Sequence, residues 1–268
     1  MAEEEVVLMK KEKPVLISGG RRADGRKFTD LRPLKISAGV LKQADGSALI
    51  EWGRNKVIVG VYGPHEVFPK HLTNPYRAII NARYVMTPFA SLEEHGRAGP
   101  NRRSIEISKV AKHVFENTVI TQEFPKTMID VHMEVLQSDG GTRVAAITAA
   151  SVALADAGIP LRDLACGVSV GKVEGELVVD LDKYEDNLGE SDMPMIFAPR
   201  TRELLLYQMD GMLTREEIRE CIKMGLNASE KIHALQVKAL KEKYEAIAAK
   251  ASAETKGNGS NGETSEGK

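Results

Sequence analysis

The sequence predicts an α/β fold of the α+β kind, in which helices pack on mixed β-sheets. Pairs of β-type runs separated by two or three turn residues indicate hairpins, whose strands are antiparallel. Helical patterns lie between these runs, and mixed sheets with helices packed on them are the usual result of such an order. The chain has 268 residues, of which 42% are hydrophobic, which suffices for one large domain or two small ones.

The first half of the chain is expected to be rich in strands. A hairpin is predicted from residues 47–52 and 56–62, and a third strand from 77–86. Residues 105–115 predict a helix, because their apolar side chains recur at helical spacing. Residues 128–136 alternate strictly between apolar and polar side chains, which predicts a strand with one buried face.

The second half is expected to begin and end with helices. Thr214 to Glu217 form a capping box that starts the last helix, and Gly225 is a point where this helix could break. The expected elements are, in order, an Ala-rich helix over 142–157 ended by Gly158 and Pro160, a hairpin of 167–173 and 176–181, strands at 193–197 and 203–208, and a helix from 214 to about 244.

The two ends of the chain differ in composition from the middle. Residues 1–20 are charged and end in a Gly-Gly pair, so we interpret them as a mobile or docking arm. Residues 249–268 are mostly small and polar, and such a segment is expected to be a disordered tail. The main domain is expected over 21–248, with a first part at about 21–160 and a second part at 161–248.

Composition excludes several classes of protein. The two cysteines, Cys166 and Cys221, form no Cys-x-x-Cys pair, which argues against a disulfide scaffold or a zinc site and favours the cytoplasm. No stretch approaches the ~20 apolar residues of a membrane span, and the charged start is unlike a signal peptide. The net charge of −1 means that a nucleic-acid enzyme of this composition must gather its cations locally or use partner surfaces.

A glycine-rich motif, Gln137-Ser-Asp-Gly-Gly-Thr-Arg143, lies between a predicted strand and a predicted helix. Adjacent glycines allow a sharp turn and let an anion approach the backbone amides. The first amides of a helix lack intrahelical partners and carry the positive end of the helix dipole. Arg143 works against that dipole by ~0.3–1 kcal/mol unless an anion is present. The motif therefore predicts a phosphate cradle; the alternative is a tight turn capped by Asp139.

A second basic motif, Asn101-Arg102-Arg103-Ser104, directly precedes the predicted helix 105–115. Two arginines at a helix start are locally unfavourable, so an external phosphate is a plausible partner. The alternative is a solvated basic turn that is ion-paired to nearby glutamates.

An acidic run follows the second predicted hairpin. Six carboxylates fall within 13 residues, and packing them together is costly unless a cation or a shared proton relieves their repulsion. Such a group suits Mg²⁺, which takes oxygen ligands and usually bridges to substrate phosphate; the alternative is an acidic surface loop. Asp186 and Asp192 are the sharper candidates, because Asp192 directly precedes a predicted strand. The run consists of Asp180, Asp182, Glu185, Asp186, Glu190 and Asp192.

These motifs, in this order, resemble the RNase PH family, and within it the catalytic ring subunits of archaeal exosomes. The resemblance covers most of the chain, from about Arg22 to the end of the last predicted helix. It is carried by Arg22-Ala-Asp-Gly-Arg26, Tyr62-Gly-Pro64, Met86-Thr-Pro-Phe89, Arg102-Arg-Ser-Ile-Glu106, Gln137-Ser-Asp-Gly-Gly-Thr-Arg143, Ala155-Asp-Ala-Gly-Ile-Pro160, Asp180-Leu-Asp182, Glu185-Asp186 and Asp192-Met-Pro194.

The resemblance implies an RNase PH fold that forms a hexameric ring. The ring would be a trimer of heterodimers with a homologous non-catalytic RNase PH-like subunit, and RNA-binding cap proteins would sit on one face, with no membrane partner. The implied activity is phosphorolysis of single-stranded RNA: inorganic phosphate, as co-substrate, attacks the 3′-terminal phosphodiester and releases nucleoside diphosphates. The reverse reaction would add 3′ tails.

The resemblance also implies roles for individual residues. Asp186 and Asp192 match the catalytic and metal-binding pair, with Mg²⁺ as the expected ion. Arg102 and Arg103 match contacts to the RNA backbone, and Lys70 and His71 match a loop at the ring entrance that touches passing RNA. The expected phosphate-binding residues are Ser138, Gly140, Gly141, Thr142 and Arg143.

Three other functions remain open. Bacterial tRNA-trimming relatives read Asp-Met-Asn where this chain has Asp192-Met193-Pro194, which favours the exosome branch over a homohexameric tRNA 3′-end trimmer. A non-catalytic RNA-binding ring subunit should lack the Asp186/Asp192 pair or Arg143, and this chain has all three. A hydrolytic, metal-dependent nuclease would need no phosphate cradle.

Overall fold

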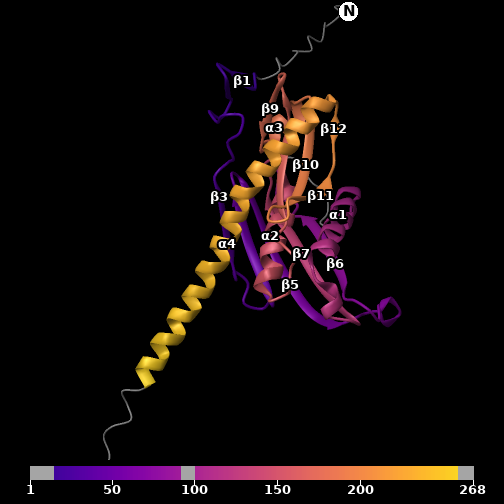
Figure 1. Cartoon of the computed structure of the whole chain (residues 1–268), viewed down its shortest axis with the longest axis vertical. Coiled ribbons are helices and arrows are strands. Elements are labelled where there is room, and N and C mark those ends of the chain that lie inside the picture. Colours follow the sequence, from indigo (N-terminus) through magenta and orange to yellow (C-terminus); the bar gives the residue numbers. More distant parts are fainter. Residues whose placement is uncertain (1–14, 92–99, 259–268) are drawn as a thin grey trace, which may run out of the picture.

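The computed structural model describes residues 15–91 and 100–258 and consists of two five-stranded sheets with helices packed between and around them (Figure 1). In the first sheet β6 pairs parallel with β7 and the other neighbours are antiparallel, so the sheet is mixed, as predicted. Its order is β3 (Leu34–Ala38), β4 (Gly46–Trp52), β5 (Asn55–Glu66), β7 (Thr127–Gln137) and β6 (Ile79–Met86).

The second sheet is antiparallel and carries the acidic run near one end. Its main path is β11 (Glu203–Tyr207), β10 (Ser191–Ala198), β8 (Cys166–Val173) and β9 (Glu176–Val179), with β12 (Asp210–Gly211) paired to β10. A separate small ribbon joins β1 (Ile17–Ser18) to β2 (Arg21–Arg22).

Helix α2 (Thr142–Asp156) lies between the two sheets and forms the centre of the core. It contacts β4, β5 and β7 on one side and β8 and β10 on the other, and almost all its residues are buried. Its many alanines suit this position, because small side chains let both sheets approach closely. The start of α2 is therefore fixed by both sheets, which matters for the chemistry at that end.

Two further helices cover the outside. Helix α1 (Arg102–Thr118) packs on β6, and its apolar side chains Ile107, Ala111, Val114 and Phe115 are buried as the helical spacing predicted. The long helix α4 (Arg215–Asn258) crosses β8 and β3 and then extends away from the sheets (Figure 1). Among the described residues, no helix combines the length and apolarity that crossing a membrane would require.

The predicted break near Gly225 is wrong, because α4 is continuous there. Gly225 serves close packing instead: a Cβ at this position would lie 2.6 Å from the Cε atom of Met195. The helix also continues past the predicted end near Tyr244, so residues 249–258 are helical and not a disordered tail. Residues 259–268 lie outside the described part of the chain.

The described end of the N-terminal arm is docked on the second sheet. Leu16 is buried against Val173, Val178 and Leu181. The backbone amides of Leu16 and Ile17 donate to the Glu174 carboxylate at 2.9 and 3.0 Å. The arm was expected to be either mobile or docked, and residues 15–18 are docked. Residues 1–14 lie outside the described part of the chain.

Candidate active site

A polar cavity of about 450 Å³ gathers side chains from three of the motifs found in the sequence. It lies where the starts of α1 and α2 approach the short helix α3 (Lys183–Leu188) and the ends of β10 and β11. Its lining consists of Arg103, Glu106, Arg143, Asp186, Asn187, Asp192, Pro194, Gln208, Met209 and Asp210.

The start of α2 has open backbone donors. Gly140 and Gly141 have φ angles of +75° and +67°, a left-handed region that favours glycine, and no side chain caps the helix at Gly141. Along the described chain, the first amide of this helix to reach a backbone carbonyl is that of Ala145, which donates to Gly141 at 3.2 Å. The preceding amides therefore remain free for an anion.

Arg143 is held at the cavity wall by two side chains. One Nη1–H donates to Oε1 of Gln208, and the same nitrogen lies 3.8 Å from the Glu106 carboxylate. Gln208 in turn donates to Glu106 at 3.1 Å. This arrangement balances the charge of Arg143 while it remains near the open amides, so the guanidinium is oriented before any anion arrives.

The second basic motif is split between the cavity and the surface. Asn101 and Ser104 form a capping box that starts α1, with the Ser104 amide donating to Asn101 Oδ1 at 2.7 Å. Both arginines between them are exposed, and of the two only Arg103 lines the cavity.

Tyr84 connects the starts of α1 and α2 from inside the core. Its hydroxyl donates to Thr142 Oγ1 at 2.9 Å. Burial raises the pKa of Tyr84, while the Thr142 hydroxyl and the charges of Arg103 and Arg143 oppose that rise. The Thr142 hydroxyl therefore already accepts a hydrogen bond, and its side chain is only 2% exposed.

Asp186 and Asp192 form a carboxylate pair on the wall of the cavity. The Ser169 hydroxyl donates to Asp192. Burial, and next the negative charge of Asp186, raise the pKa of Asp192 to about 7, with Ser169 and Arg143 opposing the rise. A carboxyl with such a pKa holds a proton part of the time at neutral pH, as a general acid requires.

The same pair is also a reasonable set of ligands for a divalent cation. Mg²⁺ is usually held by one or two carboxylates together with waters and substrate phosphates. Within residues 15–91 and 100–258, no cluster of three or more His, Cys, Asp or Glu side chains has metal-binding geometry. In this part of the chain Asp186 and Asp192 therefore do not belong to a closed protein cage for a metal ion.

Comparison with known families identifies the chain. A model described as "3′ exoribonuclease family, domain 1" matches residues 30–160, and one for domain 2 of the same family matches residues 163–228. The chain belongs to the RNase PH family. The family resemblance inferred from the sequence motifs is thereby confirmed.

Relatives within the RNase PH family are similar over most of their length. "Exosome complex component Rrp41" of Pyrococcus furiosus is 57% identical over 229 residues, which cover 85% of this chain and 91% of that protein. The Rrp41 component of Thermoplasma volcanium is 53% identical over 223 residues, with coverages of 83% and 90%.

Two solved structures have the same fold. The crystal structure of rice Rrp46 superposes with a TM-score of 0.73 at 30% identity and covers 82% of this chain and 100% of that one. A chain of the Archaeoglobus fulgidus exosome with RNA bound to the active site gives a TM-score of 0.69 at 26% identity, with coverages of 84% and 92%. The predicted RNase PH fold is therefore confirmed.

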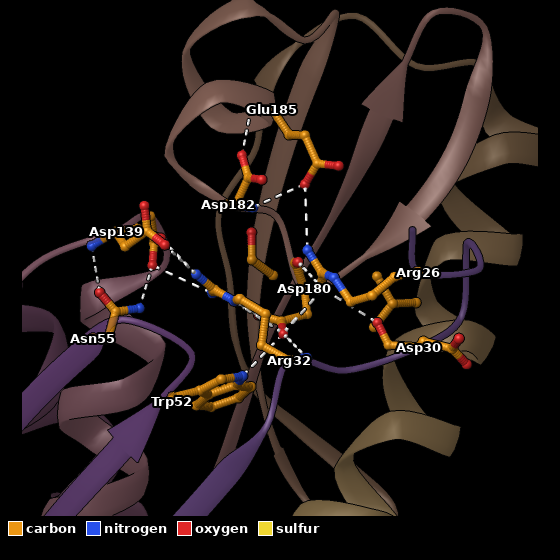
Figure 2. A network of polar contacts seen from close by, with 12 residues as sticks. Arg26, Asp30, Arg32, Trp52, Asn55, Asp139, Asp180, Asp182 and Glu185 are labelled. Atoms are coloured by element: carbon orange, nitrogen blue, oxygen red, sulfur yellow. Dashed lines mark hydrogen bonds and ion pairs between the residues drawn. The ribbon is translucent and has the colours of Figure 1, made fainter. Parts of the chain in front are cut away.

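The structure separates the six carboxylates of the acidic run, and they do not form one cluster. Asp180 is buried in an ion pair with Arg32 (Figure 2), and Glu185 is buried in an ion pair with Arg22. Asp182 caps α3 by accepting from the amides of Tyr184 and Glu185. Glu190 accepts from the Gly175 amide. Only Asp186 and Asp192 of the run line the cavity.

Several other predicted residues lie outside the cavity lining. Ser138 lines a neighbouring cavity, and its amide and hydroxyl both donate to the Ala90 carbonyl. Lys70 and His71 lie in an exposed turn (Lys70–Leu72) between β5 and β6, where Lys70 pairs with Glu66 at 3.1 Å. Their role at a ring entrance stays a prediction.

The raised pKa of Asp192 has a consequence for stability. Below about pH 4 the carboxyl is protonated in both the folded and the unfolded chain. As the pH rises from there to about 7, the unfolded chain releases this proton while the folded chain keeps it, so the free energy of unfolding falls. We expect the free energy of unfolding in urea to fall by more than about 1 kcal/mol between pH 5 and pH 8 because of this group. In Asp192→Asn that part of the pH dependence should disappear; an unchanged profile would contradict the raised pKa.

Proposed function

We propose that this chain is the catalytic subunit of an archaeal exosome ring and acts as a phosphorolytic 3′→5′ exoribonuclease. The observation that carries the proposal is the single cavity in which Arg143, at an amide-rich helix start, faces the Asp186/Asp192 pair. Similarity to Rrp41 exosome components, at 57% identity for the one from Pyrococcus furiosus, supports the exosome assignment. Inorganic phosphate and the 3′ end of single-stranded RNA would be the substrates.

The main chemical obstacle in this reaction is the repulsion between two anions. The free amides at the start of α2 and Arg143 would hold the attacking phosphate, and the left-handed backbone of Gly140 and Gly141 makes the turn into this helix start. Arg103 in the cavity and Arg102 outside its lining would hold the RNA backbone. The positive groups offset the repulsion between the phosphate and the RNA backbone and orient the two anions for reaction.

The carboxylate pair would serve the leaving 3′ oxygen. At neutral pH the proton that Asp192 holds part of the time can be delivered to that oxygen as the P–O bond breaks. If Mg²⁺ accompanies the substrate, Asp186 and Asp192 would hold it, and the ion would supply charge neutralisation at the phosphates. The product is a nucleoside diphosphate, which retains a phosphoanhydride bond, so the reaction should reverse when diphosphate is abundant.

Partner subunits are part of the proposal. The relatives are named as components of a complex, and a net charge of −1 gives this chain little overall attraction for RNA. We propose a hexameric ring of three such chains alternating with a homologous non-catalytic RNase PH-like subunit, with RNA-binding cap proteins, in the cytoplasm. Lys70 and His71 would touch RNA at the ring entrance.

The proposal is tested by the phosphate dependence of degradation. Poly(A) is incubated with the full-length chain, with and without the homologous partner subunit, and the products are separated to look for ADP. We expect ADP to form only with phosphate present and to form faster in the complex. Degradation that persists with Mg²⁺ and no phosphate would instead establish a hydrolytic nuclease.

The arginines at the start of α1 should control RNA affinity. The double variant Arg102→Ala/Arg103→Ala is expected to weaken binding of single-stranded RNA, because two phosphate contacts are lost. The slope of log Kd against log salt should fall by about 1.4, the value for two contacts to a single strand. Lys109→Ala/Lys112→Ala removes the same charge from the same helix away from its start, and equal effects of both double variants would reassign Arg102 and Arg103 to the general surface.

A further inference from the structure

A buried arginine outside the cavity links the two segments that carry the proposed chemistry. Arg32 donates from Nε and Nη2 to the Asp180 carboxylate at 3.1 and 2.6 Å. Its Nη1 donates to the backbone carbonyl of Asp139 (Figure 2). Its Nη2 lies 3.4 Å from the carbonyl of Gly140. One side chain thus spans the glycine-rich turn before α2 and the strand end before α3.

Asn55 fixes the same turn. Its Nδ2 donates to the Gly140 carbonyl at 2.6 Å, and its Oδ1 accepts from the Asp139 amide at 2.6 Å. Because a trans peptide is planar, turning the carbonyls of Asp139 and Gly140 toward Arg32 and Asn55 turns the next two amides, of Gly140 and Gly141, the opposite way. In the part of the chain that the structure describes, those two amides donate to no protein group.

The turn is also packed directly against the segment that leads to Asp186. A Cβ on Gly140 would lie 2.5 Å from the carbonyl carbon of Asp182, the residue that caps α3. Asp180 is held in place by the Trp52 indole N–H at 2.9 Å and by the Arg32 amide at 2.6 Å. The position of the glycine-rich turn relative to α3 therefore depends on groups that Arg32 joins.

We propose that Arg32 is a positioning residue for phosphate: it keeps the amides of Gly140 and Gly141 turned outward and the turn in register with the helix that carries Asp186. The inference rests on the proposed function and deepens it. Arg32 would thus influence the affinity for phosphate although its side chain contacts neither phosphate nor RNA.

The test uses Arg32→Lys in the full-length chain assembled with its ring partner. Lysine keeps a positive charge beside Asp180, so the buried carboxylate stays compensated, but a single ammonium lacks the planar fork needed to reach both segments. Steady-state rates are measured with phosphate and RNA varied separately. We expect the KM for phosphate to rise about tenfold, the equivalent of one weakened charged hydrogen bond, with kcat and the KM for RNA changed less than about threefold.

Arg22→Lys is the matched control. Arg22 is equally buried and binds Glu185 and the carbonyls of Val179 and Asp180, but it makes no contact with the glycine-rich turn. It should leave the KM for phosphate unchanged. Asn55→Ala, which removes the second hold on the Gly140 carbonyl, should raise that KM and gives an answer if Arg32→Lys does not assemble.

The outcomes separate the two ideas. If wild-type degradation depends on phosphate and neither Arg32→Lys nor Asn55→Ala shifts the KM for phosphate, the positioning role is overturned and the proposed function stands. Equal shifts in Arg32→Lys and Arg22→Lys would likewise reduce Arg32 to a fold-stabilising residue. A wild-type complex that ignores phosphate overturns the proposed function, and the inference with it.

Discussion

Replacing Asp186 with asparagine will abolish RNA turnover while leaving ring assembly and RNA binding nearly intact. Asp186 lines the cavity beside Asp192, and the pair provides the only proposed source of a proton or of metal ligands for the leaving oxygen. Loss of a general acid costs typically 10²–10⁴-fold in rate, and loss of a metal ligand would add to this. Single-turnover assays on a labelled RNA at saturating phosphate measure the effect.

Glu190→Gln is the matched control for Asp186. Glu190 belongs to the same acidic run and loses the same charge, but its carboxylate binds the Gly175 amide and lies 3.5 Å from Lys172, away from the cavity lining. It should retain wild-type activity. An Asp186→Asn protein that turns over RNA normally would show that the carboxylate has no catalytic role, and one that fails to assemble would show that it is structural.

Asp180→Asn should destabilise the fold by about 3–5 kcal/mol, the usual cost of leaving one partner of a buried ion pair uncompensated. Asp180 is 1% exposed and accepts from Arg32, Arg26 and Trp52. Asparagine is the informative replacement because the backbone at this position has a φ of +61°, which asparagine tolerates and alanine does not. Urea unfolding of the purified chain gives the free energy.

The matched control for stability is Glu51→Gln. Glu51 pairs with Lys56 at 3.2 Å, but both side chains are about a third or more exposed to solvent. Such surface pairs contribute ~0–1 kcal/mol, so the free energy of unfolding should barely change. Similar losses in Asp180→Asn and Glu51→Gln would mean that the buried network does not organise this end of the molecule.

Much of the fold could be predicted because its signals are local. The strict alternation in 128–136 identifies β7, and the Ala-rich stretch before Gly158 and Pro160 identifies α2, the helix buried between both sheets. The cavity residues could be found in the same way: Arg103 and Arg143 follow turn signals at helix starts, and Asp192 stands at a strand end. Their chemical roles remain predictions.

The features that could not be predicted depend on contacts between distant parts of the chain. Arg32 meets Asp180 across 148 positions, and Arg22 meets Glu185 across 163, so charge counting alone could not separate the structural carboxylates from Asp186. Tyr84 was missed because it lies on β6, and Gln208 because it lies in the connection between β11 and β12; neither stands in a motif of its own. Gly225 was misread because glycine costs a helix only ~1 kcal/mol relative to alanine, and because the close approach of Met195, which leaves no room for a Cβ, is not visible in the sequence.

Trp52 is the sole tryptophan of the chain, and its indole donates to the carboxylate that Arg32 also binds. Its intrinsic fluorescence will therefore report on this one locus and on no other part of the protein. A red shift in emission that precedes the loss of circular dichroism would reveal local loosening before global denaturation. Tryptophan fluorescence therefore indicates whether the contacts that join the glycine-rich turn to the acidic segment are intact.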